Sequence, residues 1–266
     1  MNLPALDPYR ERSSPIHRLD ARLKLIVALA FIVIISLTPP GAWPAHFLYL
    51  LILIAVMLLA KVTPLSVLAR SMLALPFALL AALGILYVRE GIPLVTVPLL
   101  SWRITITDVG LLRFASLMVK AWLSLLVSIT LAFVTPFWEI VRAMQGLGVP
   151  RMLTVVILLM HRYLGVLADE AQRLMRAREA RSAELVGIKS RGSLRWRAQV
   201  TGRMIGTLFL RTYERSERVY NAMLARGFAG DVRTLRNPEL SARDLAFAGL
   251  VLSALMSVVV IARSYW

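Results

Sequence analysis

Five long apolar segments constrain this chain more than any other feature. They cover residues 23–38, 45–60, 71–88, 114–134 and 245–262. The chain is 58% hydrophobic, whereas soluble domains are about 45–50% apolar. A helix that crosses a bilayer needs roughly 20 apolar residues. Several segments are shorter, and flanking arginines that reach toward the interface would lengthen them. The pattern predicts an all-α integral membrane protein with about five transmembrane helices.

The distribution of basic residues predicts the orientation. Five basic residues lie before the first apolar segment or at its start: Arg10, Arg12, Arg18, Arg22 and Lys24. The link 39–44 contains none, and cytoplasmic loops are enriched in Lys and Arg. We therefore expect a cytoplasmic N-terminus and, after five spans, an external C-terminus. The link 89–113 would lie outside despite its three arginines.

Two further expectations concern the apolar segments themselves. Residues 1–21 have no apolar core, so the first segment is predicted to be a retained helix and not a cleaved signal. Lys120 lies inside the fourth segment and is expected to face the protein interior, because a charge in contact with lipid is costly.

A long basic segment separates the fourth apolar segment from the fifth. Residues 135–243 hold 19 of the 31 Lys and Arg residues. We predict a membrane domain over 1–134, a cytoplasmic domain of long helices over 135–243 and a C-terminal transmembrane helix over 244–266.

Three helices are expected inside the basic segment. The first has Thr135 as its N-cap and Pro136 in its first turn, and "GLGVP" at 146–150 ends it. The second starts near Pro150, and its apolar run, 152–160, is too short to span a membrane alone. The third covers about 196–225 and ends at Gly227 and Gly230. Its residues at intervals of three to four share one face: Leu208, Thr212, Arg215, Val219 and Met223.

The motifs of catalysis and metal binding are missing from the sequence. There is no phosphate-binding P-loop, no zinc spacing and no cysteine. The few carboxylates do not cluster, and His17, His46 and His161 are far apart in the chain. We expect no catalytic residue, no metal ligand and no cofactor site in this chain.

Two short units place an arginine between small residues near predicted helix ends: Ala180-Arg181-Ser182 and Ala225-Arg226-Gly227. Three interpretations are open. The arginines could stabilise helix C-termini through the macrodipole, bind anionic lipid, or dock into a partner protein. The small neighbours favour docking, since they would let each guanidinium enter a tight groove and pair bidentately with a carboxylate.

Four stretches resemble the transmembrane T component of energy-coupling factor (ECF) transporters, in the cobalt/nickel-type (CbiQ-like) branch: "SPIHRLDARLKL" (14–25), "TPFWEIVRAMQGLGVP" (135–150), "HRYLGVLADEAQRLMRAREARS" (161–182) and "RTYERSERVYNAMLARGFAG" (211–230). The two arginine units match the family's motifs at the ends of its coupling helices. Ser182 stands where the family commonly has Gly.

The resemblance implies a non-catalytic permease subunit in the bacterial cytoplasmic (inner) membrane. Its partners would be two ABC-type ATPase subunits, which bind ATP and Mg, and a membrane S component that binds the substrate. It also allows for a small accessory membrane subunit, and nucleic acid is not an expected partner. Arg181 and Arg226 would anchor the coupling helices on the ATPases, whose closure would move the S component. The expected substrate is the cobalt or nickel ion.

Seven further positions are assigned supporting roles in the coupling helices: Pro136, Glu139, Gly146, Gly148, Pro150, Arg178 and Met223. The methionines of this region could form an adaptable surface or simply fill a core. The alternatives are a T component of a vitamin-type ECF importer, a membrane-embedded lipid-modifying enzyme, and a basic protein that binds lipid or nucleic acid.

Overall fold

A computed structural model describes residues 14–87, 93–99, 102–181, 194–230 and 241–265. The chain divides into two compact units. The first comprises residues 1–147 and 237–266, and the second comprises residues 148–236. The first unit therefore extends 13 residues beyond the end predicted for the N-terminal membrane domain.

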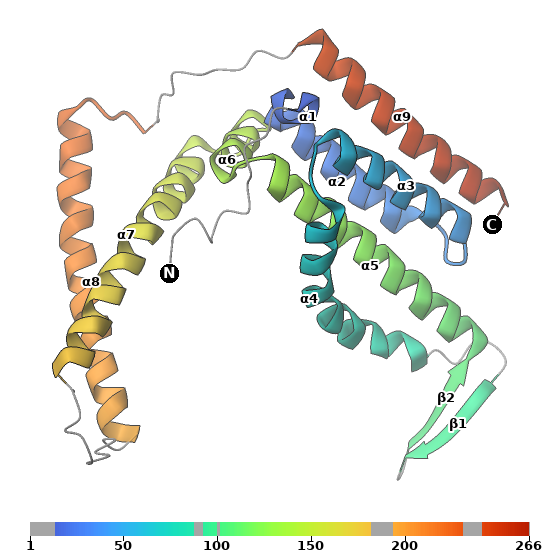
Figure 1. Ribbon diagram of the computed structural model, residues 1–266, viewed down its shortest axis with the longest axis horizontal. Coiled ribbons are helices and arrows are strands. Elements are labelled where there is room, and N and C mark those ends of the chain that lie inside the picture. The colour runs from blue at the N-terminus through green and yellow to red at the C-terminus, as the bar shows by residue number, and fades with distance from the viewer. Residues whose placement is uncertain (1–13, 88–92, 100–101, 182–193, 231–240, 266) are drawn as a thin grey trace. The chain divides into compact units, whose positions relative to one another are not determined.

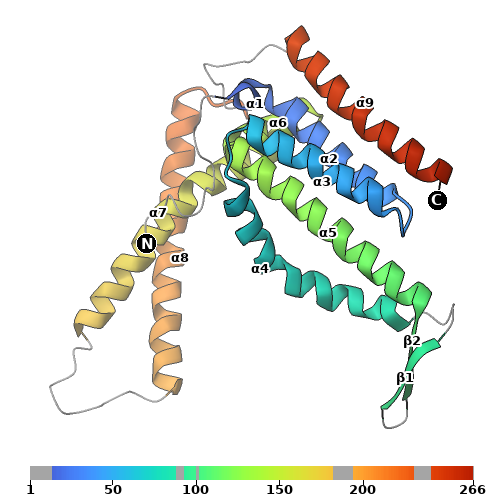
Figure 2. The same cartoon turned by 45° about the vertical axis from the view of Figure 1, so that its right-hand side comes forward.

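Apolar helices build the first unit (Figure 1). Their bounds are α2 Ala21–Leu37, α3 Trp43–Leu59, α4 Pro64–Ala82, α5 Asp108–Val134 and α9 Ala242–Tyr265. Each covers most of one predicted span, and the predicted all-α membrane class is confirmed. Figures 1 and 2 show α2, α3, α5 and α9 running side by side, while α4 packs on α5 and is bent. Pro76 lies inside α4, where it removes a helical hydrogen bond.

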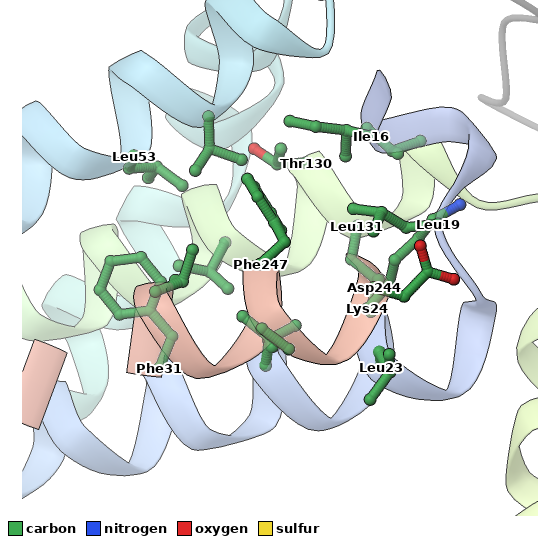
Figure 3. Close-up of a pocket in the computed structure, with 17 residues that line it drawn as sticks. Ile16, Leu19, Leu23, Lys24, Phe31, Leu53, Thr130, Leu131, Asp244 and Phe247 are labelled. Atoms are coloured by element: carbon green, nitrogen blue, oxygen red, sulfur yellow. The ribbon is translucent and has the colours of Figure 1, made fainter. Parts of the chain in front are cut away.

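The core of this unit lies between α2, α3, α5 and α9. Tyr49 and Leu255 are fully buried, and the rings of Tyr49 and Phe31 meet edge to face with centroids 5.9 Å apart. A small apolar pocket of about 90 Å³ remains between these helices. Figure 3 shows Phe31 and Phe247 beside it, with Lys24 and Asp244 at one end.

The same pocket shows which helix ends lie together. Leu23 at the start of α2, Val134 at the end of α5 and Asp244 at the start of α9 all line it. The start of α2, the end of α5 and the start of α9 thus lie at the same end of the first unit.

The turn between α2 and α3 is held by α5. Lys120 Nζ donates to the carbonyl oxygens of Ser36 (3.2 Å) and Thr38, and Ser116 Oγ accepts from the Gly41 N–H at 3.1 Å. A cation is favoured at the C-terminal end of a helix. The prediction that Lys120 faces the protein interior is confirmed.

The described part of the chain begins with two consecutive helices, each with a side-chain N-cap. Ser14 accepts from the His17 N–H and caps the four-residue helix α1, Pro15–Arg18, and Asp20 accepts from the Arg22 N–H and caps α2. Lys24 Nζ then donates to the His17 carbonyl at 3.0 Å. The stretch 14–25 is one of those that carry the family resemblance. It connects α1 to α2 through two helix caps and the hydrogen bond from Lys24.

Several predicted boundaries were wrong, because capping extends helices beyond their apolar runs. The helix α5 begins six residues before the predicted span, since Thr107 Oγ1 accepts from the Gly110 N–H. Thr135 ends α5, and Pro136 is the N-cap of α6, Phe137–Gly146. The predicted N-cap role of Thr135 was therefore wrong. The Pro136 carbonyl accepts from the Glu139 and Ile140 N–H groups and so starts the helix. Proline has no N–H to donate, and none is required at the start of a helix.

The link predicted to lie outside contains a β-hairpin. Strands β1, Pro93–Leu99, and β2, Trp102–Thr107, pair antiparallel with Leu99 opposite Trp102. The 3₁₀ helix η2, Leu83–Tyr87, precedes it. Within the described residues, this hairpin is a departure from the predicted all-α class.

Two long helices form the second unit, α7, Arg151–Arg181, and α8, Leu194–Ala225. They cross in both views (Figures 1 and 2). By length and composition, four described helices could cross a membrane: α4 with η2, α5, α7 and α9. The apolar run 152–160 is continued by a mixed stretch that includes His161 and Arg162, and with this stretch α7 is long and apolar enough, by length and composition, to cross a membrane.

Candidate functional site

The unit Ala225-Arg226-Gly227 forms the end of α8. Gly227 has φ +79°, its N–H donates to the Leu224 carbonyl at 2.9 Å, and the Phe228 N–H donates to the Met223 carbonyl at 3.0 Å. These two bonds are the Schellman arrangement of a helix C-terminus, in which Arg226 is the C-cap and Gly227 the left-handed residue. The sequence prediction that Gly227 ends this helix is confirmed.

Two residues of the other unit, Ala180 and Arg181, are the last residues of α7. Arg181 is the last residue of α7 and shares its last turn with Arg178, where positive charge is favoured. Ala180 and Arg181 are both exposed. Ser182 lies outside the described residues.

The two arginines lie at opposite ends of one helical hairpin. Arg178 Nη1 donates to Thr201 Oγ1 at 3.3 Å, and Arg211 pairs with Glu170 at 2.5 Å. Contacts that move back along α7 therefore move forward along α8, so the helices are antiparallel. Along α8, Arg226 is 25 residues beyond Thr201, which is about 38 Å at 1.5 Å per residue.

Both guanidinium groups are available to a partner. Arg181 and Arg226 are exposed, and neither guanidinium group has a hydrogen bond or ion pair to any residue within the described ranges. The macrodipole interpretation and the docking interpretation are compatible here, since a C-terminal arginine can favour its helix and still present its charge outward.

The predicted supporting residues fall into two groups. Glu139 and Gly146 belong to α6 in the first unit, with Pro136 at its N-cap. Gly148 has φ +102°, and the Pro150 carbonyl accepts from the Leu153 and Thr154 N–H groups to start α7. Arg178 and Met223 contribute to the contacts within the α7–α8 hairpin.

Gly146 has a specific reason to be small. A Cβ at this position would lie 2.5 Å from Arg22 Nε and 2.8 Å from Arg22 Cζ. The glycine thus lets the Arg22 side chain of α2 lie against α6. Spacing along the sequence could not reveal this contact, because 124 residues separate the two positions.

Some residues that complete the hairpin were not predicted from the sequence. Phe228 follows the Schellman glycine and lines the same apolar hollow as Met223, and apolar residues are common at these two positions of the motif. An apolar residue directly after a predicted C-terminal glycine was the available signal. The Glu170–Arg211 pair between α7 and α8 carried no such signal.

Within the described residues, no group of three or more His, Cys, Asp or Glu side chains is placed to hold a metal ion.

The fold and the site together define a polytopic α-helical membrane protein with an exposed helical hairpin that bears an arginine near each end.

Comparisons with known proteins identify the family. The profile of the CbiQ family, described as cobalt transport protein, matches residues 12–236. The chain belongs to this family, and its resemblance to the T component of ECF transporters is confirmed.

Three relatives illustrate the match. An energy-coupling factor transporter transmembrane protein, EcfT, of Acidaminococcus fermentans is 27% identical over 97% of this chain and 96% of its own length. A protein of Bifidobacterium longum, provisionally named an ABC transporter ATP-binding protein, is 26% identical over 96% of this chain and 33% of its own length. A protein of Methanocorpusculum labreanum, provisionally named the fused cobalt transport protein CbiMQ, is 27% identical over 82% of this chain and 35% of its own length.

Proposed function

We propose that this chain is the energy-coupling subunit of an ECF-type ABC importer. It transmits the ATP-driven motion of two ATPase subunits to a membrane S component. The observation that carries this proposal is the pair of exposed arginines, Arg181 and Arg226, at opposite ends of the α7–α8 hairpin.

The geometry suits two separate docking sites. Arg181 ends α7, and Arg226 directly follows α8. A force on either guanidinium would therefore be transmitted along a long, rigid helix. The separation of the two ends favours one groove for each arginine, as expected for a pair of like ATPase subunits. The name of the B. longum relative, an ATP-binding protein that includes a region similar to this chain, supports an ATPase partner.

In this proposal the chain itself is not an enzyme and holds no cofactor. ATP and Mg would bind to the partner ATPases, and the S component would select the substrate. The family description and the name CbiMQ favour the cobalt ion, with nickel as the related choice. The relatives named EcfT carry no substrate in their names, which keeps a vitamin as the alternative cargo.

The proposed location is the bacterial cytoplasmic membrane with the N-terminus inside. The basic residues before α2 support this orientation. The common end of the first unit at which α2 begins, α5 ends and α9 begins would then face the cytoplasm, so the basic segment between α5 and α9 would meet the ATPases there.

Co-purification with the neighbouring gene products tests the proposal. The tagged wild-type chain, extracted in mild detergent, should retain ATPase subunits, and the double variant Arg181→Ala/Arg226→Ala should lose them. The matched control is Arg176→Ala/Arg203→Ala, which removes two exposed arginines of the same helices away from their ends. Equal loss of ATPase in both double variants, or no loss in either, would show that the assigned residues are wrong.

A further inference from the structure

The α7–α8 hairpin contains two adjoining hollows of different chemistry. The first, about 270 Å³, is apolar. Its lining includes Val156, Met160, Tyr163, Val219, Tyr220 and Met223. The second, about 220 Å³, is polar and is lined by arginine and glutamate side chains of α8 together with Glu170 of α7. Leu167, Thr212 and Arg215 line both hollows.

Arg215 carries the unbalanced charge where the hollows meet. It lies in a helix face whose other members are apolar or small, Leu208, Thr212, Val219 and Met223. The two neighbouring arginines have carboxylate partners: Arg211 pairs with Glu170, and Arg218 lies 3.9 Å from Glu214. In the part of the chain that the structure describes, no hydrogen bond or ion pair involves the Arg215 guanidinium.

We propose that this pair of hollows binds one anionic phospholipid. An acyl chain would lie in the apolar hollow, and the phosphate would pair with Arg215. Guanidinium groups bind phosphate bidentately, and an apolar channel that ends in such a group matches the chemistry of a lipid with a negative head group. This inference goes beyond the proposed coupling function and does not depend on it.

The exposed apolar side chains favour lipid as the occupant. Val156, Met160 and Tyr220 line the apolar hollow, yet they remain 50%, 58% and 55% exposed. An 18-residue window of α7 has a mean hydropathy of 1.6, in the range of a membrane-spanning helix. The bilayer is the apolar medium that a membrane protein always contacts. The methionines would adapt to a mobile acyl chain, and tyrosines are enriched at membrane interfaces.

Lipid binding to the purified full-length chain tests this inference. Native mass spectrometry in mild detergent would compare phosphatidylglycerol with phosphatidylcholine of the same acyl chains. The wild type should bind one phosphatidylglycerol more tightly than phosphatidylcholine. Arg215→Gln should weaken phosphatidylglycerol binding about fivefold, since one basic residue near a lipid surface contributes about 1 kcal/mol. It should leave phosphatidylcholine binding unchanged.

Two controls keep the test specific. Arg203→Gln removes an exposed arginine of the same helix that lines neither hollow, and it should bind phosphatidylglycerol as the wild type does. Arg215→Lys keeps the charge but not the bidentate geometry, so it should bind phosphatidylglycerol less tightly than wild type and more tightly than Arg215→Gln; this variant also separates lost charge from lost folding.

Three outcomes would overturn the inference: equal binding of the two lipids, equal losses in Arg215→Gln and Arg203→Gln, or normal phosphatidylglycerol binding by Arg215→Gln. The last outcome would show that Arg215 does not bind the phosphate. None of these readouts involves the ATPases or transport, so the lipid inference can fail while the coupling proposal stands.

Discussion

The Phe228 N–H donates to the Met223 carbonyl at 3.0 Å, across Gly227, and so fixes where α8 ends. The left-handed backbone at Gly227, φ +79°, makes this bond possible. Arg226 lies between the last helical residue and this glycine, so the same bond also fixes the position of the Arg226 backbone at the end of the hairpin.

Replacing Gly227 with alanine should destabilise the end of α8. A Cβ there would meet nothing within 4 Å, so the cost is conformational, about 1–2 kcal/mol for a non-glycine residue in left-handed backbone. Hydrogen exchange should show faster exchange at the Gly227 and Phe228 amides.

Gly202 provides the matched control. It lies inside α8, and a Cβ there also meets nothing within 4 Å. Gly202→Ala should therefore stabilise the helix by up to about 1 kcal/mol. If both substitutions changed exchange in the same direction, the left-handed conformation would not be what limits position 227.

Replacing Lys120 with methionine should lower the unfolding free energy by about 1–3 kcal/mol, because the carbonyls of Ser36 and Thr38 lose their donor. Thermal unfolding in detergent measures the effect. Lys120→Arg keeps a cationic donor and should lose less. Equal losses in the two variants would indicate that packing, and not the hydrogen bonds, determines the role of this position.

The ion pair between Arg211 and Glu170 should contribute little to stability. The two side chains are 57% and 23% exposed, and exposed pairs contribute under about 1 kcal/mol. A double-mutant cycle with Arg211→Gln and Glu170→Gln, followed by thermal unfolding, should give a coupling energy in this range that falls with added salt. A coupling energy of several kcal/mol would mean that this pair is a principal link between α7 and α8.

Because the chain has no cysteine, its topology can be read from single introduced thiols. Ala177→Cys lies on the exposed surface of α7, and Pro40→Cys lies in the exposed turn between α2 and α3. In intact cells a membrane-impermeant maleimide should label position 40 and not position 177. Labelling of position 177 alone would reverse the proposed orientation.

The sequence predicted the helices well and their ends poorly. The apolar runs identified α2, α3, α4, α5 and α9, because burial in a membrane requires long apolar stretches. The ends depend on capping contacts, such as Thr107 with Gly110, that apolar runs do not record. Thr135 could end one helix or begin the next on sequence alone, and only the backbone assigns it to α5.

The candidate site was predictable where a local signal existed. Gly227 marked the end of α8 because few other residues adopt left-handed backbone. The contact of Arg22 with Gly146 and the pairing of Glu170 with Arg211 join residues far apart in the chain, which no local pattern records. Whether Arg181 and Arg226 dock on ATPases stays a prediction.

Chemical cross-linking from the two hairpin ends tests the coupling proposal most directly. Ala180→Cys and Ala225→Cys place a thiol beside each arginine in a chain that has no other thiol. A thiol-to-amine cross-linker, applied to the assembled complex in membranes, should join each single variant to one ATPase subunit. The variant with both thiols should give a product with two ATPase subunits on one chain. If the two thiols captured only one ATPase subunit between them, or none, the two ends would not occupy separate grooves and the proposed coupling geometry would be contradicted.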